Sequence, residues 1–124
     1  MRTEGDPSRR SKAGRAAMKQ DSFKDFVLDQ LSDLRGVTCR PMFGGYGVYQ
    51  GEVFFGIIHQ GRLYFKTNDR TRQAYVKRGM KPFRPNARQR LRTYYEVPVD
   101  IIEDHEQLMG WAEQAAGHAG RAVG

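Results

Sequence analysis

The sequence contains a single cysteine, Cys39, so it cannot form an internal disulfide bond. Structural disulfides are common in secreted proteins, and their absence is typical of a protein kept in a reducing cytoplasm. Long apolar runs are missing as well. No stretch approaches the roughly 20 apolar residues that a membrane-spanning helix requires, and residues 1–20 lack the apolar segment of a signal peptide. The composition therefore predicts a cytoplasmic protein without a membrane-spanning segment.

Catalytic and metal-binding patterns are also scarce. The three histidines, His59, His105 and His118, are far apart and share no metal-ligand spacing with Cys39. No Ser-His-Asp order or pair of carboxylates occurs in a context that suggests catalysis. A reactive thiol at Cys39, next to Arg40, stays open as an alternative, but a small strand residue is the favoured interpretation. We therefore expect no enzymatic activity, no cofactor and no metal.

Charge is abundant but unevenly distributed along the chain, whose formal net charge is +7. Residues 62–92 contain eleven basic residues and one acidic residue, whereas residues 93–124 contain one basic and six acidic residues. Residues 1–20 are also basic, and residues 21–61 are mildly acidic. Such an asymmetry bears on partners and association rather than on the fold. It makes the basic middle segment a candidate binding surface.

The 124 residues are enough for one domain with its own core. Residues 1–20 are rich in Arg, Lys, Ser, Gly and Ala and have almost no large apolar side chain, which predicts a disordered basic tail. This tail contacts nucleic acid, or it is a solvated extension, or translation begins after most of it, at Met18. The folded domain is expected to span residues 21–116, followed by a frayed C-terminus over residues 117–124.

A helix is predicted to begin after a cap at Asp21 or Ser22 and to end at Gly36. Apolar residues recur at helical spacing between these limits: Phe23, Phe26, Val27, Leu31 and Leu34. Carboxylates recur every four residues in the same segment, which we call the acidic stripe: Asp21, Asp25, Asp29 and Asp33. Like charges at this spacing are unfavourable by about 0.2–0.5 kcal/mol per pair. The stripe is either a solvated face or a surface that meets basic groups, within the chain or on a partner.

A glycine-rich and aromatic stretch over residues 40–49 follows. Gly44, Gly45 and Gly47 stand beside aromatic residues and are followed by more strand-forming sequence. A phosphate-binding loop needs a glycine loop that leads into a helix, and its P-loop form needs a Gly-Lys-Ser/Thr motif, which the sequence lacks. The glycines therefore favour a bent or bulged strand. The clustered aromatic residues are predicted to belong to the core: Phe43, Tyr46, Tyr49, Phe54, Phe55 and Phe65.

Further strands are predicted over residues 37–42, 53–58, 62–66, 80–83 and 90–97. Residues 53–58 are apolar on both faces, which indicates a central strand between two hairpin turns. A short helix over residues 69–78 is predicted, with its cap at Asn68. The final helix is expected to begin at Asp104, where Gln107 completes a capping box. Its apolar face consists of Leu108, Trp111, Ala112 and Ala115.

Two of the predicted strands combine basic and aromatic residues on one side. Strict alternation places Leu63 and Phe65 on the inward side of the first strand. The outward side then carries Arg62, Tyr64 and Lys66. In residues 90–97 the corresponding set is Arg90, Arg92, Tyr94 and Glu96. If the two strands are neighbours, these residues form a basic-aromatic sheet face suited to nucleic acid, because cations contact phosphates and tyrosines stack on bases. The surface is extended by Arg70, Arg72, Lys77, Arg78, Lys81, Arg84 and Arg88. An ordinary solvated face is the alternative.

Five motifs occur in the order seen in one protein family. They are Met42-Phe43-Gly44-Gly45-Tyr46-Gly47, Leu63-Tyr64-Phe65-Lys66, Pro82-Phe83, Tyr94-Tyr95-Glu96-Val97-Pro98 and Leu108-x-x-Trp111-Ala112. With these motifs, residues 22–116 resemble the N-terminal domain of the TfoX/Sxy competence-regulator family. The resemblance implies an α+β fold, a two-layer α/β sandwich. Its antiparallel sheet of about five to six strands is flanked by N-terminal, middle and C-terminal helices.

The resemblance also implies a bacterial, cytoplasmic transcriptional coregulator, which in the best-known members acts with the cyclic-AMP receptor protein on competence genes. Full-length regulators carry a second, helical domain for which this sequence has no counterpart. No catalytic residues come with the family. We therefore expect a non-enzymatic regulatory module that contacts a transcription factor or a second copy of itself, with the acidic stripe as the contact. The alternative is a nucleic-acid-binding domain that uses the basic-aromatic sheet face.

Overall fold

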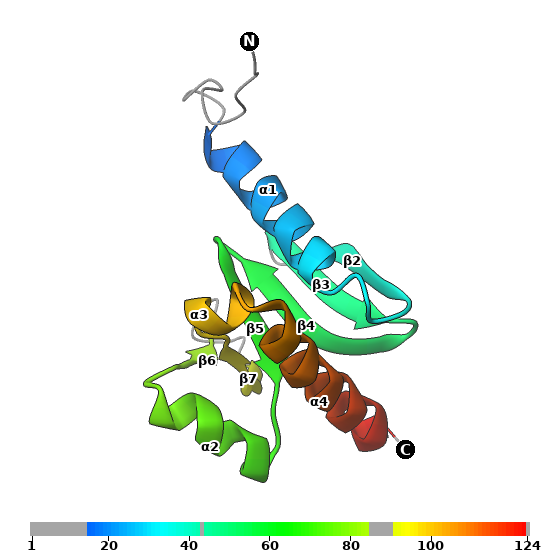
Figure 1. Cartoon of the computed structure of the whole chain (residues 1–124), viewed down its shortest axis with the longest axis vertical. Coiled ribbons are helices and arrows are strands. Elements are labelled where there is room, and N and C mark those ends of the chain that lie inside the picture. The colour runs from blue at the N-terminus through cyan, green and yellow to red at the C-terminus, as the bar shows by residue number, and fades with distance from the viewer. Residues whose placement is uncertain (1–14, 43, 85–90, 124) are drawn as a thin grey trace.

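The computed structural model describes residues 15–42, 44–84 and 91–123, of which residues 15–20, 91–92 and 118–123 are described by their backbone alone. Within these residues, helices and strands follow one another along the chain (Figure 1): α1 (Arg15–Gln30), β2 (Val37–Met42), β3 (Gly45–Gln50), β4 (Val53–His59), β5 (Arg62–Lys66), α2 (Asp69–Lys77), β6 (Pro82–Phe83), β7 (Leu91–Glu96), α3 (Val99–Ile102) and α4 (His105–Val123). The strands form one antiparallel sheet in the order β2-β3-β4-β5-β7-β6. The predicted α+β class is confirmed.

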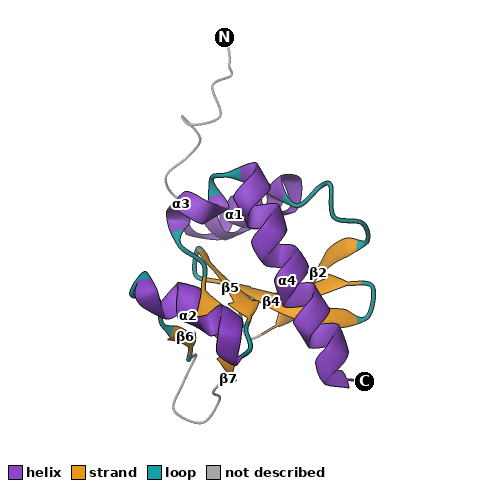
Figure 2. Ribbon diagram, turned by 60° about the horizontal axis from the view of Figure 1, so that its bottom comes forward, coloured by secondary structure: helices purple, strands orange, loops and turns teal. Residues whose placement is uncertain are grey.

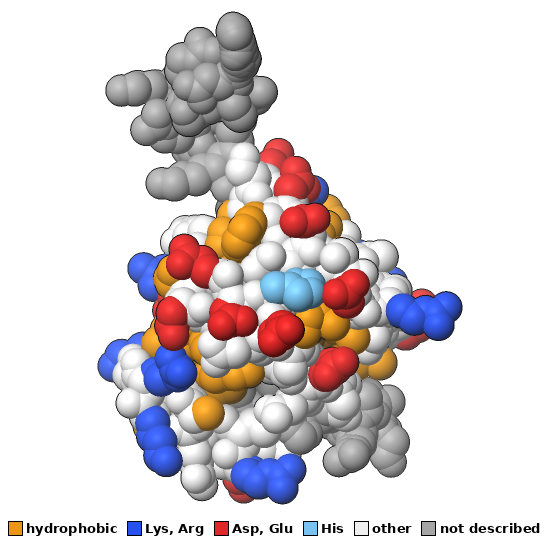
Figure 3. Space-filling view, in the orientation of Figure 1, with side chains coloured by type: hydrophobic (Ala, Val, Ile, Leu, Met, Phe, Trp, Pro, Cys, Tyr) orange, Lys and Arg blue, Asp and Glu red, His pale blue; other side chains and the backbone are white. Residues whose placement is uncertain are grey.

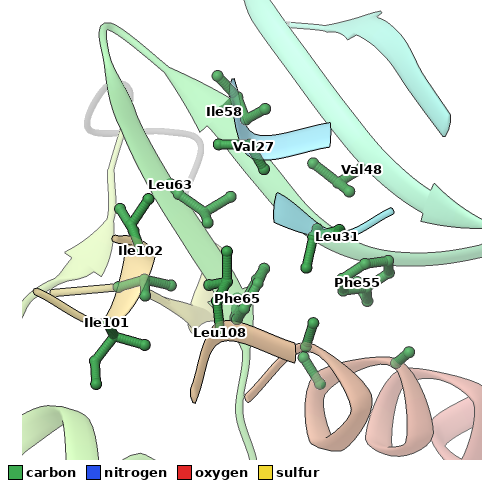
Figure 4. Close-up of a cluster of buried hydrophobic side chains, with 14 of the residues drawn as sticks. Val27, Leu31, Val48, Phe55, Ile58, Leu63, Phe65, Ile101, Ile102 and Leu108 are labelled. Atoms are coloured by element: carbon green, nitrogen blue, oxygen red, sulfur yellow. The ribbon is translucent and has the colours of Figure 1, made fainter. Parts of the chain in front are cut away.

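The main core lies between the helices and one face of this sheet (Figure 2). Val27 of α1 and Leu108 of α4 pack with strand residues such as Phe65, as the close-up in Figure 4 shows. Tyr75 of α2 and Ile101 of α3 belong to the same cluster, so every described helix contributes to this side of the sheet. Helices and sheet therefore form the expected two layers, held together by burial of apolar surface.

The glycine-rich stretch forms β3, and a β-bulge lies where β3 meets β4. Val48 pairs with Gly56 and Tyr49 pairs with Phe54, so Phe55 has no partner on β3. The extra residue changes which side chains reach which face. Phe55 packs in the main core, whereas Phe54 packs on the opposite face of the sheet. The extra residue of the bulge thus lies on β4 and not in the glycine-rich strand β3, for which a bend or bulge was predicted. Strand β4 is the central strand that its apolar sequence predicted.

Several local predictions agree with the structure. Asn68 caps α2 by accepting a hydrogen bond from the Thr71 backbone N–H, and Thr71 Oγ1 accepts one from the Asn68 N–H in return. Asp104 accepts a hydrogen bond from the Gln107 backbone N–H at the start of α4. The Gln107 side chain differs from a capping box, because its amide donates to the Asp104 carboxylate and not to the cap's backbone.

The first helix differs from its prediction at both ends. It begins at Arg15, ahead of the expected cap at Asp21 or Ser22, and it ends at Gln30, ahead of Gly36. Adding a residue to an existing helix is far easier than starting one, so segment 15–20, which contains Ala, Met and Lys, continues the helix. The rest of the predicted basic tail, residues 1–14, lies outside the described residues.

The C-terminal part adds one helix and extends another. The short helix α3 follows Pro98, which stands at its N-cap, and it buries Ile101 and Ile102. The predicted frayed segment, residues 117–124, is helical as far as Val123. The segment between β6 and β7, residues 85–90, lies outside the described residues, as does Phe43.

Candidate interaction surfaces

The face of the sheet opposite the main core carries a second, smaller apolar cluster. Ile57, Phe83 and Tyr94 are buried in it, and Phe54 and Tyr64 pack against them. All five residues belong to strands, and among the described residues no helical side chain joins them. We call this side of the sheet the aromatic face. Of the clustered aromatic residues that were predicted to belong to the core, Phe55 and Phe65 are buried in the main core and Tyr46 packs against it, whereas Phe54 packs against this second cluster.

Three rings form a continuous row on the aromatic face. The ring centroids of Tyr49 and Phe54 are 5.2 Å apart, and those of Phe54 and Tyr94 are 5.1 Å apart. A cation lies against each end of this ring row. The Arg40 guanidinium is 4.3 Å from the centroid of Tyr49, and the Lys66 ammonium is 5.5 Å from the centroid of Tyr94. Such cation–π contacts contribute about 0.5–1 kcal/mol each at exposed sites.

Two local features position the rings of the ring row. A Cβ atom on Gly47 would lie 2.9 Å from Met42 Sδ and 3.0 Å from a ring carbon of Tyr49, so the missing side chain makes room for the ring. The Tyr94 hydroxyl donates a hydrogen bond of 3.1 Å to the carbonyl oxygen of Phe54. Burial raises the pKa of Tyr94 to about 12, so its hydroxyl keeps the donated proton at neutral pH.

The cations of this face differ in their partners. Arg62 donates to both carboxylate oxygens of Glu96 at 3.1 Å, an arrangement that neutralises its charge locally. Lys66 donates to the hydroxyl of Thr93 at 3.0 Å, and no described carboxylate lies within ion-pair distance of it. Arg40 is 3.9 Å from Glu52, a long and exposed pair. Lys66 and Arg40 are therefore the cations most available to an anionic ligand.

The predicted nucleic-acid residues fall into separate groups. Strands β5 and β7 are neighbours, with Lys66 paired to Tyr94, so the predicted sheet face does bring together Arg62, Tyr64, Lys66 and Tyr94. The cations of α2 belong to the layer of helices on the other side of the sheet, which we call the helix side. Tyr75 of α2 packs edge-on against Trp111 of α4 there, with the two ring centroids 4.7 Å apart. This second group contains Arg70, Arg72, Lys77 and Arg78.

Two members of the second group already have partners. Arg78 contacts Asp100 at 3.0 Å and lies 5.8 Å from the Trp111 centroid, and Arg72 pairs with Asp69. Arg90 lies outside the described residues. Arg92 is described by its backbone alone, in a part of β7 where the pairing with β6 shifts register.

The exposed surface of α1, α3 and α4 is acidic, opposite in charge to the cations of the aromatic face. In the view of Figure 3, acidic side chains spread over α1, α3 and α4. Residues 99–117 contain five carboxylates and no Lys or Arg, and residues 21–33 add the four aspartates of the acidic stripe beside the single Lys24. We call this surface the acidic face: Asp21, Asp25, Asp29, Asp33, Asp100, Glu103, Asp104, Glu106 and Glu113.

The two ends of the acidic stripe have contacts within the domain. The Tyr46 hydroxyl donates to Asp21 at 2.8 Å, and this hydrogen bond raises the pKa of Tyr46. Asp33 lies 2.9 Å from His105 Nε2, at the start of α4. The two middle residues are exposed, and the ion pair described for Asp25 is with its neighbour Lys24, at 3.7 Å. Asp25 and Asp29 are therefore the members of the stripe best placed to meet a partner.

The Cys39 thiol is partly buried and is not activated. Burial raises the pKa of Cys39 to about 11, so its thiol is protonated at neutral pH and is a poor nucleophile. Within the described residues, no three His, Cys, Asp or Glu side chains are grouped so as to hold a metal ion. None of the helices in that part of the chain is both long enough and apolar enough to cross a bilayer.

Residues that the sequence did not single out complete the aromatic face. Arg40, Tyr49, Phe54 and Phe83 were not assigned to any binding surface. Arg40 of β2 pairs with Gly47 of β3, and Tyr49 lies two residues further along β3. The three residues therefore share one side of the sheet, and alternation along each strand was a usable signal for this. Phe54 gave no such signal, because the bulge at Phe55 breaks the alternation of β4.

The family comparison agrees with this fold. Residues 29–119 match the model of the TfoX N-terminal domain, which covers most of the 124-residue chain. No curated protein matches the chain. The matched region includes the whole sheet, together with α2, α3 and most of α4. The resemblance carried by the sequence motifs is thus confirmed, and the chain belongs to the TfoX N-terminal domain family.

Proposed function

We propose that this domain is a non-enzymatic regulatory module that acts in the cytoplasm by binding another protein through its acidic face. Membership of the TfoX N-terminal domain family supports a regulatory role, because the best-known members are transcriptional coregulators. A transcription factor is accordingly the first partner to test. A second copy of this chain is the other.

The observation that carries the proposal is the gathering of carboxylates from three separate helices on one face (Figure 3). Exposed carboxylates repel one another, and a basic partner surface would relieve that repulsion. Exposed ion pairs contribute only about 0–1 kcal/mol each, so the charges would mainly steer and orient the partner. Binding should therefore be stronger at low ionic strength.

Apolar side chains on the same helices offer contacts that charge alone does not provide. Phe26 of α1 is 42% exposed and stands between Asp25 and Asp29 in the sequence. Val99 of α3 is 63% exposed and is followed by Asp100. Exposed aromatic residues in the middle of an interface often contribute most of its binding energy. Phe26 is the residue we assign to this role.

The test compares charge reversals of equal size at two places. Asp29→Lys changes the acidic face, and Glu52→Lys makes the same change in the exposed turn between β3 and β4. Light scattering and sedimentation of each protein would be followed across ionic strength, alone and with a candidate transcription factor. We expect association at low salt that Asp29→Lys weakens and Glu52→Lys leaves intact, with a larger loss when Asp25→Lys is added and a separate loss from Phe26→Ser.

One outcome removes the support for this function. If the unmodified protein stays monomeric and without a partner at every salt concentration, the acidic face is only a solvated surface. Equal effects of Asp29→Lys and Glu52→Lys would mean that net charge, and not this face, controls association.

A further inference from the structure

We propose that the ring row of the aromatic face, with Arg40 and Lys66 beside its two end rings, binds single-stranded nucleic acid. This activity is separate from the proposed protein contact, because the ring row lies on the side of the sheet away from the helices. The ligand is recognised by two chemical features, unpaired bases and phosphates. DNA and RNA share both of them.

The rings provide the surface on which bases stack. Tyr49 and Phe54 are half-buried, so each residue is held by its ring neighbours and still has some surface in contact with solvent. Tyr94 is buried and acts as a positioning residue, because it stacks on Phe54 and donates its hydroxyl proton to the Phe54 carbonyl. Stacking on aromatic side chains tolerates any base, since every base has a π face. Binding should therefore show little sequence preference.

The cations provide the phosphate contacts. Half of the Arg40 side chain is exposed, and its only described ion-pair partner is the distant Glu52 carboxylate. Lys66 is held by the Thr93 hydroxyl and by the Tyr94 ring, neither of which neutralises its charge. The other carboxylate of this face, Glu96, is engaged by Arg62. The two cations beside the ring row are thus free to exchange these contacts for a phosphate.

The same geometry favours a single strand over a duplex. In a duplex the base faces are covered by their neighbours, so they cannot stack on protein rings. A helix commonly enters the major groove of DNA, but the outward surfaces of α1, α3 and α4 carry the acidic face, which repels phosphates. The aromatic face is a sheet surface without a described helix, and unpaired bases fit such a surface.

The experiment uses the full chain and labelled oligonucleotides of about 12 nucleotides, within the range that comparable stacking domains cover. Fluorescence anisotropy would compare mixed-sequence single-stranded DNA, RNA of the same sequence, and the matching DNA duplex across salt concentrations. We expect both single strands to bind more tightly than the duplex, with an affinity that falls as salt rises. The DNA and RNA arms show which strand is preferred.

Two substitutions separate the two kinds of contact. Arg40→Ala should weaken binding and reduce the slope of log affinity against log salt by about 0.7, the value for one phosphate on a single strand. Tyr49→Leu keeps an apolar side chain but removes the ring, so it should weaken binding by roughly 5- to 150-fold, the range for one stacked base, without changing the slope. Arg70→Ala, an equal loss of charge on α2, should change neither quantity.

Trp111 gives an internal control, because it is the single tryptophan and packs on the helix side against Tyr75. Its fluorescence should report that each variant is folded and should not respond to the oligonucleotide. The proposal is wrong if no single strand binds at the lowest salt, if the duplex binds more tightly, or if Arg40→Ala and Arg70→Ala have equal effects. Binding that quenches Trp111 would place the ligand on α2 and overturn the assignment to the aromatic face.

Discussion

Gly45 and Gly47 of β3 are needed because a side chain at either position would collide with its surroundings. Neither has a positive φ, so an unusual backbone angle is not the reason. A Cβ atom on Gly45 would lie 2.1 Å from the carbonyl oxygen of Ile58, in the neighbouring strand. A Cβ atom on Gly47 would instead meet side chains, which have some freedom to move. Gly45 therefore sets how closely β3 approaches β4, and Gly47 sets how the ring row lies on the sheet.

Gly45→Ala should destabilise the protein severely. The added methyl group would push against backbone that other strands hold in place, and such overpacking should cost at least about 3 kcal/mol of unfolding free energy. Gly110→Ala is the matched control, because a Cβ atom there has nothing within 4 Å and the residue lies inside α4. That change should stabilise the protein by about 0.5–1 kcal/mol. Chemical denaturation of both variants measures the difference, and similar unfolding midpoints would contradict the role of Gly45.

At the scale of the elements, the end of α1 is tied to α3 and α4 by polar contacts. The Gln30 amide donates to the carbonyl oxygen of Ile102 at 2.9 Å, and Asp33 lies 2.9 Å from His105 Nε2. The hydrogen bond to Asp33 raises the pKa of His105, with smaller contributions from other nearby groups. The protonated imidazole stands in the first turn of α4, where a positive charge is unfavourable, so the Asp33 carboxylate has a clear stabilising role.

The pH dependence of this contact has a definite sign. Because folding raises the pKa of His105, the contact contributes its full stabilisation below the unfolded pKa of about 6.5 and loses it as the pH rises through the folded pKa. Asp33→Asn should return the pKa of His105 toward its ordinary value and flatten the change in melting temperature between acidic and neutral pH. Titration of the imidazole by NMR checks the first effect, with Asp29→Asn as the control. An unchanged His105 titration in Asp33→Asn would show that the contact does not form in solution.

The sequence predicted elements well where a local rule determines them. The strict alternation over residues 62–66 and the Asn68 cap both depend on neighbours in the chain. The short helix α3 was missed because its formation depends on burying Ile101 and Ile102 against distant residues. The start of α1 was misplaced because a disordered segment and the extension of an existing helix have similar compositions here.

The candidate surfaces were harder to predict than the elements. Alternation indicated which residues of β5 share a side, but it could not show that β5 and β7 are neighbours or that α2 packs on the other side of the sheet. Basic residues that are close in sequence, such as Lys66 and Arg70, therefore lie on different surfaces. Which face a residue occupies depends on tertiary pairing, and one bulge at Phe55 was enough to change it for Phe54.

At the scale of the whole molecule, one sheet serves two apolar clusters back to back. Strand β4 contributes Phe55 and Ile58 to the main core and Ile57 to the cluster of the aromatic face. Strand β5 divides its residues in the same way, with Phe65 on one side and Tyr64 on the other. Because the same strands carry both clusters, neither should melt without the other.

Ile57→Ala tests this coupling. Ile57 has no exposed surface, and truncating such a residue should cost about 2–5 kcal/mol of unfolding free energy. Trp111 lies on the far side of the sheet, yet its fluorescence should report the same lowered midpoint as the far-UV circular dichroism. Ala112→Gly, a change within α4 on the helix side, serves as a comparison whose two signals should also coincide. Separate transitions for the two signals would show that the clusters unfold independently.

The position of opposite charges on opposite sides of the sheet limits how copies of this domain can assemble. A contact between the acidic face of one copy and the cations of the aromatic face of the next is heterologous, so each added copy exposes a new acidic face and a new aromatic face. Such growth closes only if the rotation between neighbours completes a ring. A dimer with two-fold symmetry must instead place identical patches together, and either charged face would then meet its own kind. A discrete dimer of this domain therefore needs another surface. The edge strand β2 offers one, because it is longer than β6, the strand at the other edge of the described sheet.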